Sequence, residues 1–320
     1  MEHAATAADR GRANGVTIAI PVYNERDRVE RAIRSAAPQC ERLIVADNAS
    51  TDGTAAVCER LLAEYPNMEY VRHDHNLGAL ENWYYLLSVT RSSYFMTLGS
   101  HDFIDDDFIA TLLPIFEADD AVMLASAGLR YEYDDGDETA GRDIRAFSAW
   151  RSGMHDDPVV RLRSFFFDDV NLLWTMYGLF RADAYKDCFT RDLPVYGADV
   201  VFLARIARRG KIAITDATTY HAWRRSTRDT RSAYVERMVG QKKGVATRKR
   251  MRNEMLAAMF EVLSDTERPP TLVERLRLRF KAMTKFGTFR QRGPDLPFFA
   301  LYVPVKLARK YRRLARRFRS

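Results

Sequence analysis

The sequence predicts an α/β protein whose mostly parallel sheet is covered by helices on both faces. Short runs rich in β-branched residues alternate with segments of helical periodicity through the first 220 residues. The runs are apolar along their whole length, which is typical of strands buried on both faces. With 47% hydrophobic and 29% charged residues among 320, the composition is that of a globular protein and excludes a fibrous or wholly disordered chain.

The predicted elements follow one another in a regular order. Strands are expected at Val16–Tyr23, Arg42–Asp47, Met68–His73, Tyr94–Leu98, Val122–Ala127, Leu173–Phe180 and Lys211–Tyr220. Helices are expected between them at Asp27–Ala37, Gly53–Tyr65, Gly78–Arg91, Asp106–Ala118 and Asp199–Arg209. Beyond Trp223 the alternation stops, and three further helices are expected over 231–263, 267–286 and Phe298–Phe318. This change predicts three parts, which are a disordered tail over 1–14, an α/β domain over 15–225 and a basic helical extension over 226–320.

What the sequence lacks excludes several classes of protein. The longest apolar run, Leu296–Val305, contains two prolines and is too short to span a bilayer. The first fifteen residues have no apolar stretch typical of a secretory signal, and the three cysteines are scattered. We therefore expect a cytoplasmic protein with reduced thiols. Neither of the glycine-rich motifs typical of dinucleotide sites and P-loop sites occurs.

Polar side chains follow each of the first four predicted strands. The four segments are Pro21–Glu25, Asp47–Thr54, His73–Gly78 and Gly99–Asp102. The carboxyl ends of parallel strands meet at one edge of a sheet, where open α/β folds bind their ligands. Several of these residues would also serve as helix N-caps, which is the alternative for each segment taken alone. Because the protein has no glycine-rich loop to bind phosphate, the negative charge of a phosphorylated ligand would have to be neutralised in another way. A divalent cation held by carboxylates is the simplest way.

Five segments resemble the motifs of one enzyme family in their order and spacing. They are IPVYNE at 20–25, VADNASTDGT at 45–54, HNLGALEN at 75–82, LGSHD at 98–102 and GADVVFLARIARRGKI at 197–212, followed by His221. Together they span about two thirds of the chain and resemble the family 2 glycosyltransferases, which have the GT-A fold. The resemblance implies an inverting enzyme that moves sugar from a nucleoside-diphosphate donor to an acceptor hydroxyl. The family's processive synthases carry membrane spans and a Q-x-x-R-W motif, and because this sequence has neither, we expect transfer of a single sugar.

The resemblance also assigns residues to the donor site. By their places in the motifs, the contacts to the donor are expected from Pro21, Tyr23, Glu25, Asp47, Asn48, Asn76 and Ser100. A tyrosine ring can stack on a base, and an aspartate can accept from a base N–H or a ribose hydroxyl. Many members of the family have a second aspartate where this chain has Asn48, so uracil, thymine and guanine all stay open as the base.

The resemblance implies two further roles, metal ligand and catalytic base. The family's D-x-D motif falls on Ser100–Asp102, so Asp102 is expected to bind a divalent metal, Mn²⁺ or Mg²⁺, while Ser100 replaces the first aspartate. His221 is a candidate second ligand, because imidazole suits Mn²⁺. Asp199 is the candidate base for the acceptor hydroxyl, although the family's commoner Glu-Asp pair is Ala198-Asp199 here. The changes at Ser100 and Ala198 keep one alternative open, a GT-A protein that binds nucleotide or sugar without catalysis.

The last eighty residues differ from the rest in charge. Residues 241–320 hold 22 Lys and Arg against 6 Asp and Glu, a net charge of +16, whereas 1–240 carry 28 against 37, a net charge of −9. Lys306–Ser320 places apolar residues at helical spacing among eight positive charges, a pattern typical of interfacial helices on anionic lipid. We therefore expect residues 296–320 to bind the inner face of the membrane, which suits a carbohydrate or lipid-linked acceptor in cell-envelope polysaccharide or glycolipid assembly. A solvated basic helix is one alternative, and nucleic-acid binding is a less favoured one.

Overall fold

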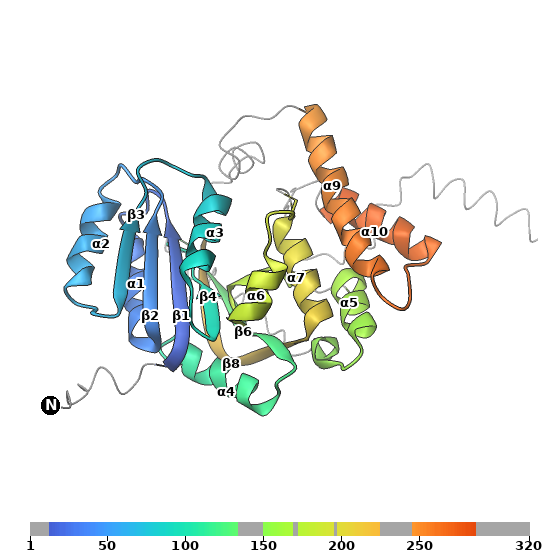
Figure 1. The fold of residues 1–320 in the computed structure, drawn as a ribbon, viewed down its shortest axis with the longest axis horizontal. Coiled ribbons are helices and arrows are strands. Elements are labelled where there is room, and N and C mark those ends of the chain that lie inside the picture. The colour runs from blue at the N-terminus through green and yellow to red at the C-terminus, as the bar shows by residue number, and fades with distance from the viewer. Residues whose placement is uncertain (1–12, 134–149, 169–171, 195–196, 225–244, 286–320) are drawn as a thin grey trace, which may run out of the picture. The chain divides into compact units, whose positions relative to one another are not determined.

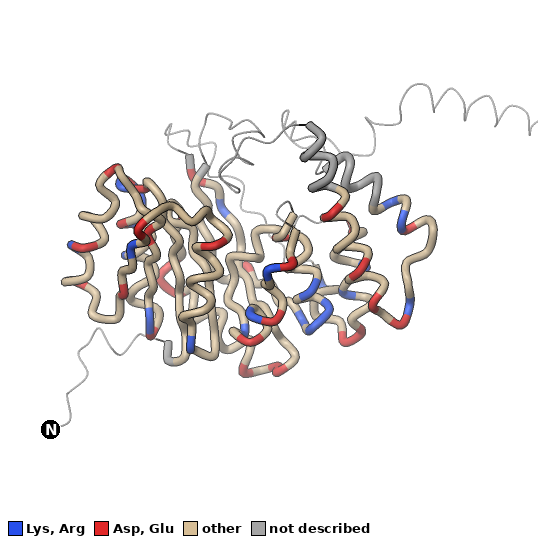
Figure 2. Tube along the Cα trace, turned by 45° about the horizontal axis from the view of Figure 1, so that its top comes forward, with Lys and Arg blue, Asp and Glu red and all other residues tan. Residues whose placement is uncertain are grey.

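The computed structural model of the chain describes residues 13–133, 150–168, 172–194, 197–224 and 245–285. Met1–Ala282 form one compact unit, and Met283–Ser320 form a second, of which only the end of one helix is described. The described residues of the first unit form a single eight-stranded sheet with helices packed on it, so the predicted α/β class is confirmed (Figure 1). Acidic and basic positions are interspersed along its described trace (Figure 2).

The strands are β1 (Ala13–Val22), β2 (Cys40–Asp47), β3 (Met68–Arg72), β4 (Tyr94–Thr97), β5 (Phe103–Ile104), β6 (Val122–Tyr133), β7 (Leu179–Arg181) and β8 (Lys211–Arg224). Their order in the sheet is β3-β2-β1-β4-β7-β6-β8-β5. β1 pairs in parallel with β2 and β4, β2 with β3, and β6 with β8, whereas β7 and β5 run antiparallel to their neighbours. The sheet is therefore mostly parallel, as predicted, and its antiparallel pairings lie beyond β4.

The helices are α1 (Val29–Ala36), α2 (Thr54–Leu62), α3 (Ala79–Val89), α4 (Phe108–Ala118), α5 (Pro158–Phe167), α6 (Ala182–Cys188), α7 (Ala198–Arg209), α9 (Val245–Ser264) and α10 (Leu272–Lys285). α1 and α2 carry the chain from β1 to β2 and on to β3, and α3 carries it back to β4 on the other side of β1. Because such crossovers are right-handed, α3 covers the face of the sheet opposite α1 and α2. Both faces are thus covered, as the apolar strands predicted.

Helix α7 is buried along most of its length and contacts α5, α6 and α9 (Figure 1). It begins after Gly197, whose φ of 80° lies in the left-handed region, where a side chain is strained. A Cβ at Gly197 would also clash with the side chain of Met255 on α9. Glycine is therefore required at this position, two residues before Asp199, and α9 packs with the sheet domain.

The structure corrects one predicted strand. Leu173–Tyr177 form a 3-10 helix with three buried central residues, and only Leu179–Arg181 join the sheet. A short apolar run suits a buried helical turn as well as a strand, so its composition did not distinguish the two. The predictions also omitted β5, α5 and α6. The helices expected over 231–263 and 267–286 are confirmed where the structure describes them, at α9 and α10, whereas Phe298–Phe318 lies outside the described residues.

Candidate active site

The ends of β1 and β2 meet in a network of hydrogen bonds. Val22 pairs with Asp47 in the register of the sheet, so the residues that follow the two strands lie close together. The Asn24 amide donates to Ser50 Oγ at 2.9 Å, and the Thr51 amide donates to Asn24 Oδ1 at 2.8 Å. Asn24 has a φ of 53°, a left-handed conformation that asparagine tolerates better than most residues. These contacts hold the turn after β1, which carries predicted donor residues.

Asp47 is completely buried beneath this turn. Its Oδ1 accepts from the amide and the hydroxyl of Ser50 at 2.9 and 2.5 Å, and its Oδ2 accepts from the Tyr70 hydroxyl at 2.7 Å. Burial and the neighbouring Asp47 raise the pKa of Tyr70, so its hydroxyl stays protonated and donates. Asp47 therefore organises the turn, and its contact with a donor base or ribose stays a prediction.

Asn48 and Asn76, both predicted donor contacts, are joined to each other. Asn48 Nδ2 donates to Asn76 Oδ1 at 2.8 Å, and Asn48 Oδ1 accepts from the Leu77 amide at 2.7 Å. Asn76 Oδ1 also accepts from the Gly78 amide at 2.8 Å. Asn48 is buried and Asn76 is exposed. The pair ties the loop after β2 to the loop after β3, as the meeting of parallel strand ends predicted.

The turn after β1 carries one open ring and one enclosed carboxylate. Tyr23 is 46% exposed, so its ring is accessible for stacking. Glu25 Oε1 lies 3.4 Å from His101 Nδ1, and Glu25 Oε2 lies 3.5 Å from an Arg28 guanidinium nitrogen. Burial lowers the pKa of His101, but the Glu25 and Asp102 carboxylates outweigh this effect and leave it raised. With its Nε2 3.8 Å from Asp102 Oδ1, His101 links the turn after β1 to the end of β4.

Asp102 follows β4 and is only 4% exposed. The Tyr220 hydroxyl donates to Asp102 Oδ2 at 2.6 Å, and the Trp223 amide donates to Oδ1 at 2.8 Å. The Tyr220 oxygen accepts from the Gly99 amide at 3.3 Å, and burial raises the pKa of Tyr220 well above its ordinary value, which keeps the hydroxyl a donor. A Cβ at Gly99 would overlap Asp102 Oδ2. Strand β8 and this glycine therefore fix the orientation of the carboxylate.

The His221 ring contacts two other carboxylates. Neighbouring residues of a strand point to opposite faces, and Tyr220 is the residue of β8 whose side chain reaches Asp102. His221 Nε2 lies 2.8 Å from Asp105 Oδ1, and its Nδ1 lies 2.9 Å from Glu132 Oε1. Both ring nitrogens are thus engaged by carboxylates. The role of His221 as a second metal ligand beside Asp102 stays a prediction.

The described residues fit a divalent cation through Asp102. Among them, no group of three or more His, Cys, Asp or Glu side chains is placed to hold an ion. A hard cation that bridges a diphosphate needs only one or two carboxylates, since phosphate and water oxygens complete its shell. A carboxylate oxygen can accept at more than one lone pair, so the bonds from β8 leave Asp102 able to act as a ligand. Ser100, where the family has its first aspartate, is also buried, at 6% exposed.

Asp199 lies at the start of α7 and is half-buried. Its Oδ1 accepts from the Val200 amide at 2.9 Å, at the helix end where the dipole favours an anion. Burial outweighs this bond and raises the pKa of Asp199 above its ordinary value of 3.8. A carboxylate of higher pKa is a stronger proton acceptor. The role of Asp199 as the base for the acceptor hydroxyl stays a prediction.

Two aromatic residues of the site, Tyr220 and Trp223, were not anticipated from the sequence. Besides its amide bond to Asp102, Trp223 lies under the Arg28 guanidinium, 3.7 Å from the ring centroid. Its ring also meets His101 edge-on at 5.6 Å. Their position in the sequence could have indicated them, because both lie within two residues of His221, which the resemblance had marked as a candidate ligand.

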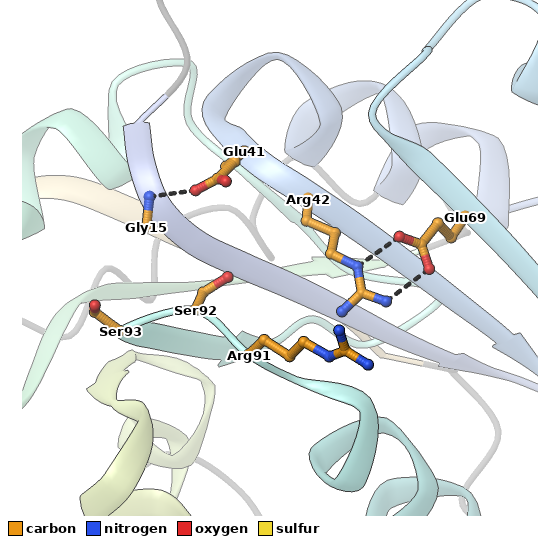
Figure 3. A pocket seen from close by; sticks show the side chains of 7 residues that line it. All are labelled: Gly15, Glu41, Arg42, Glu69, Arg91, Ser92 and Ser93. Atoms are coloured by element: carbon orange, nitrogen blue, oxygen red, sulfur yellow. Dashed lines mark hydrogen bonds and ion pairs between the residues drawn. The ribbon is translucent and has the colours of Figure 1, made fainter.

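A separate pocket lies at the amino ends of the strands, across the sheet from the candidate active site (Figure 3). It has a volume of about 590 Å³ and is lined by Gly15, Glu41, Arg42, Glu69, Arg91, Ser92 and Ser93. Arg42 donates twice to Glu69, at 2.5 and 2.7 Å, and the Gly15 amide donates to Glu41 at 2.5 Å. These residues lie at the amino ends of β1 to β4, whereas the predicted donor residues lie at the carboxyl ends. The pocket is therefore not part of the candidate active site.

Comparison with known proteins identifies the family. The family model for Glycosyl transferase family 2 matches residues 17–189, which is more than half of the chain, and the chain belongs to this family. A curated relative, Glycosyltransferase GlyG of Streptococcus pneumoniae serotype 4 (strain ATCC BAA-334 / TIGR4), is 23% identical over 126 residues, which cover 38% of this chain and 41% of GlyG. The match thus spans less than half the length of that relative.

Solved structures show the same fold at low identity. S. aureus TarS 1-349 has a TM-score of 0.58 and 14% identity, over 92% of this chain and 77% of that one. TarS 1-349 in complex with UDP-GlcNAc also gives 0.58 at 14% identity, over 85% and 73%. The mannosyltransferase PcManGT from Pyrobaculum calidifontis, in complex with GDP-Man and Mn²⁺, gives 0.51 at 16% identity, over 84% and 70%. These likenesses show the GT-A fold that the sequence predicted.

Proposed function

We propose that this protein transfers a single sugar from a nucleoside-diphosphate donor to an acceptor hydroxyl, with inversion at the anomeric carbon. The observation that carries the proposal is the placement of Asp102, a buried carboxylate that β8 holds from two sides. It lies at the same sheet edge as the turns that carry Tyr23 and Asp47. Family membership supports the reaction class, and the UDP-GlcNAc and GDP-Man complexes of the structural relatives support a nucleotide-sugar donor.

Each part of the donor has a candidate partner in this arrangement. The exposed ring of Tyr23 stacks on the base, and the turn organised by Asp47 and Asn48 receives the ribose. Asp102 is the residue that would hold a divalent metal, Mn²⁺ or Mg²⁺, against the diphosphate. When bound, such a cation offsets the charge that develops on the departing nucleoside diphosphate.

The transfer step falls to Asp199. Its carboxylate takes the proton of the acceptor hydroxyl as that oxygen attacks the anomeric carbon. The bond from this carbon to the diphosphate oxygen breaks with its electron pair on the nucleoside diphosphate. One displacement without a covalent enzyme intermediate inverts the configuration. The raised pKa of Asp199 supports this role, because a base nearer neutrality accepts a proton more readily.

The acceptor that we propose is a carbohydrate or lipid-linked molecule of cell-envelope polysaccharide or glycolipid assembly. Residues 296–320 would hold the enzyme at the inner face of the membrane. They lie outside the described residues, so this part of the proposal depends on their basic, amphipathic sequence. Within the described part of the chain, no helix combines the length and apolar character that crossing a bilayer requires.

The test has two measurements, each made with and without Mn²⁺. The first is the stabilisation of the protein by each nucleoside diphosphate, and the second is the release of nucleoside diphosphate from a panel of nucleotide sugars. A matching diphosphate at about 100 times its Kd should stabilise the fold by about 2.7 kcal/mol. Asp102→Asn should lose the metal-dependent part of this stabilisation. Asp106→Asn is the matched control, because it removes an exposed carboxylate four residues after Asp102. Binding without turnover on any acceptor would favour the non-catalytic alternative, and no response to any diphosphate would refute the donor site.

A further inference from the structure

Helix α10 exposes large apolar side chains on one side. Leu272 and Val273 are each 72% exposed, and Leu276 is 56% exposed. The other exposed large hydrophobic residues of the described chain are Tyr23, Leu62 and Met154, which lie singly in the turn after β1, on α2 and in the short 3-10 helix Arg151–Met154. Contiguous exposed apolar residues, unlike single ones, mark a surface that interacts with something.

The exposed residues Leu272, Val273 and Leu276 do not belong to a frayed helix end, because α10 is anchored at its start. The Thr271 amide donates to Glu274 Oε2 at 2.8 Å, and the Glu274 amide donates to Thr271 Oγ1 at 3.3 Å, which forms a capping box. Arg163 on α5 donates to Glu274 Oε1 at 2.8 Å, and Leu278 is 1% exposed. One side of the helix is thus fixed to the sheet domain, and the opposite side displays the apolar residues.

The sequence of α10 itself is positively charged. Leu272–Lys285 contains five Lys and Arg and a single acid, Glu274, whose carboxylate is already paired with Arg163. Arg275 and Arg277 are exposed beside the apolar residues, and Figure 2 marks such basic positions on the described trace in blue. Exposed leucines among arginines on one helix are typical of a segment that lies in the interface of an anionic bilayer.

We propose that Leu272, Val273 and Leu276 form a membrane-binding face that docks the sheet domain on anionic lipid. This deepens the membrane association proposed above, which invoked only residues 296–320. A second copy of the chain is a poorer occupant, since three side chains are few for the roughly 1,200–2,000 Å² that stable interfaces bury. The net charge of +16 over 241–320 would also make two such regions repel each other. Both features instead favour a negatively charged lipid surface.

The experiment compares vesicle binding of the full chain and of the variant L272S/L276S. Vesicles of phosphatidylcholine with phosphatidylglycerol are compared with phosphatidylcholine alone, by co-sedimentation at low and high salt. The variant should bind the anionic vesicles about 30-fold more weakly, because two leucine side chains no longer enter the interface. L62S, which removes an exposed leucine on α2, is the matched control and should bind like the wild type.

The melting temperature and the mass in solution are measured for each protein. Equal anionic-vesicle binding by L272S/L276S and L62S would overturn the proposal. A lower melting temperature or a smaller assembly in L272S/L276S, with vesicle binding unchanged, would also overturn it, because the face would then be covered by the chain itself or by a second copy. Vesicle binding needs no sugar transfer, so a failure of the proposed reaction would not affect this result.

Discussion

Replacing Tyr220 by phenylalanine should disturb the orientation of the Asp102 carboxylate and leave the rest of the site unchanged. The substitution removes the hydroxyl that donates to Asp102 Oδ2 at 2.6 Å and accepts from the Gly99 amide at 3.3 Å. It keeps the ring, which stacks on Tyr177 with centroids 5.2 Å apart. The expected consequence is a carboxylate that is present but no longer held from both sides.

The size of the effect follows from the partners of the lost bond. A hydrogen bond to a charged group contributes about 1.5–3 kcal/mol. Removal of a hydrogen bond that orients a metal ligand costs about 10- to 100-fold in metal affinity or activity, which corresponds to about 1.4–2.8 kcal/mol. The two ranges agree. We therefore expect Tyr220→Phe to bind a nucleoside diphosphate with Mn²⁺ about 10- to 100-fold more weakly than the wild type.

The assay is titration calorimetry of the matching diphosphate with and without Mn²⁺. Tyr185→Phe is the control, because it removes a hydroxyl from another buried tyrosine, 1% exposed, within the aromatic core around Phe180 and Phe202. The control should bind like the wild type. If Tyr220→Phe retains wild-type affinity in the presence of Mn²⁺, the orientation of Asp102 does not depend on β8 and the reasoning fails.

Two further predictions concern titrating carboxylates. Asp199→Asn should lower turnover by about 10²- to 10⁴-fold, with donor affinity retained, and wild-type turnover should fall as pH drops through a raised pKa that lies above 3.8. Because the folded state raises this pKa, the associated stability is present at low pH and lost as pH rises through the folded pKa. Asp199→Asn should therefore melt no lower than the wild type at neutral pH; a lower melting temperature would contradict the buried-charge argument. Arg163 lowers the pKa of Glu274 to about 2, so this pair contributes stability above pH 4.5 that is lost as pH falls towards 2. Glu274→Gln should cost about 1 kcal/mol at pH 7 after screening by solvent and nothing near pH 2, as urea unfolding at both pH values would show.

Local patterns in the sequence were enough to predict the first half of the fold. β1 to β4 and α1 to α4 lie where apolar runs and helical periodicity placed them, to within a few residues. Parallel connection then requires the strand ends to meet at one edge, which brings Asn48 to Asn76 and the turn after β1 to Asp47. The family resemblance likewise depends on short motifs, and the family match confirms it.

The structure was needed wherever a contact joins residues distant along the chain. One partner of Asp102 is Tyr220, 118 residues later, and nothing in the local pattern of either residue specifies that hydrogen bond. The face of β8 on which each side chain lies depends on its position along the strand, which sets Tyr220 against Asp102 and His221 against Asp105 and Glu132. The 3-10 helix at Leu173–Tyr177 likewise depends on packing, because a short apolar run satisfies burial in either backbone conformation. Backbone propensity and motif order are local properties that a sequence carries directly, whereas the hydrogen bonds that orient the Asp102 carboxylate arise from packing between distant segments.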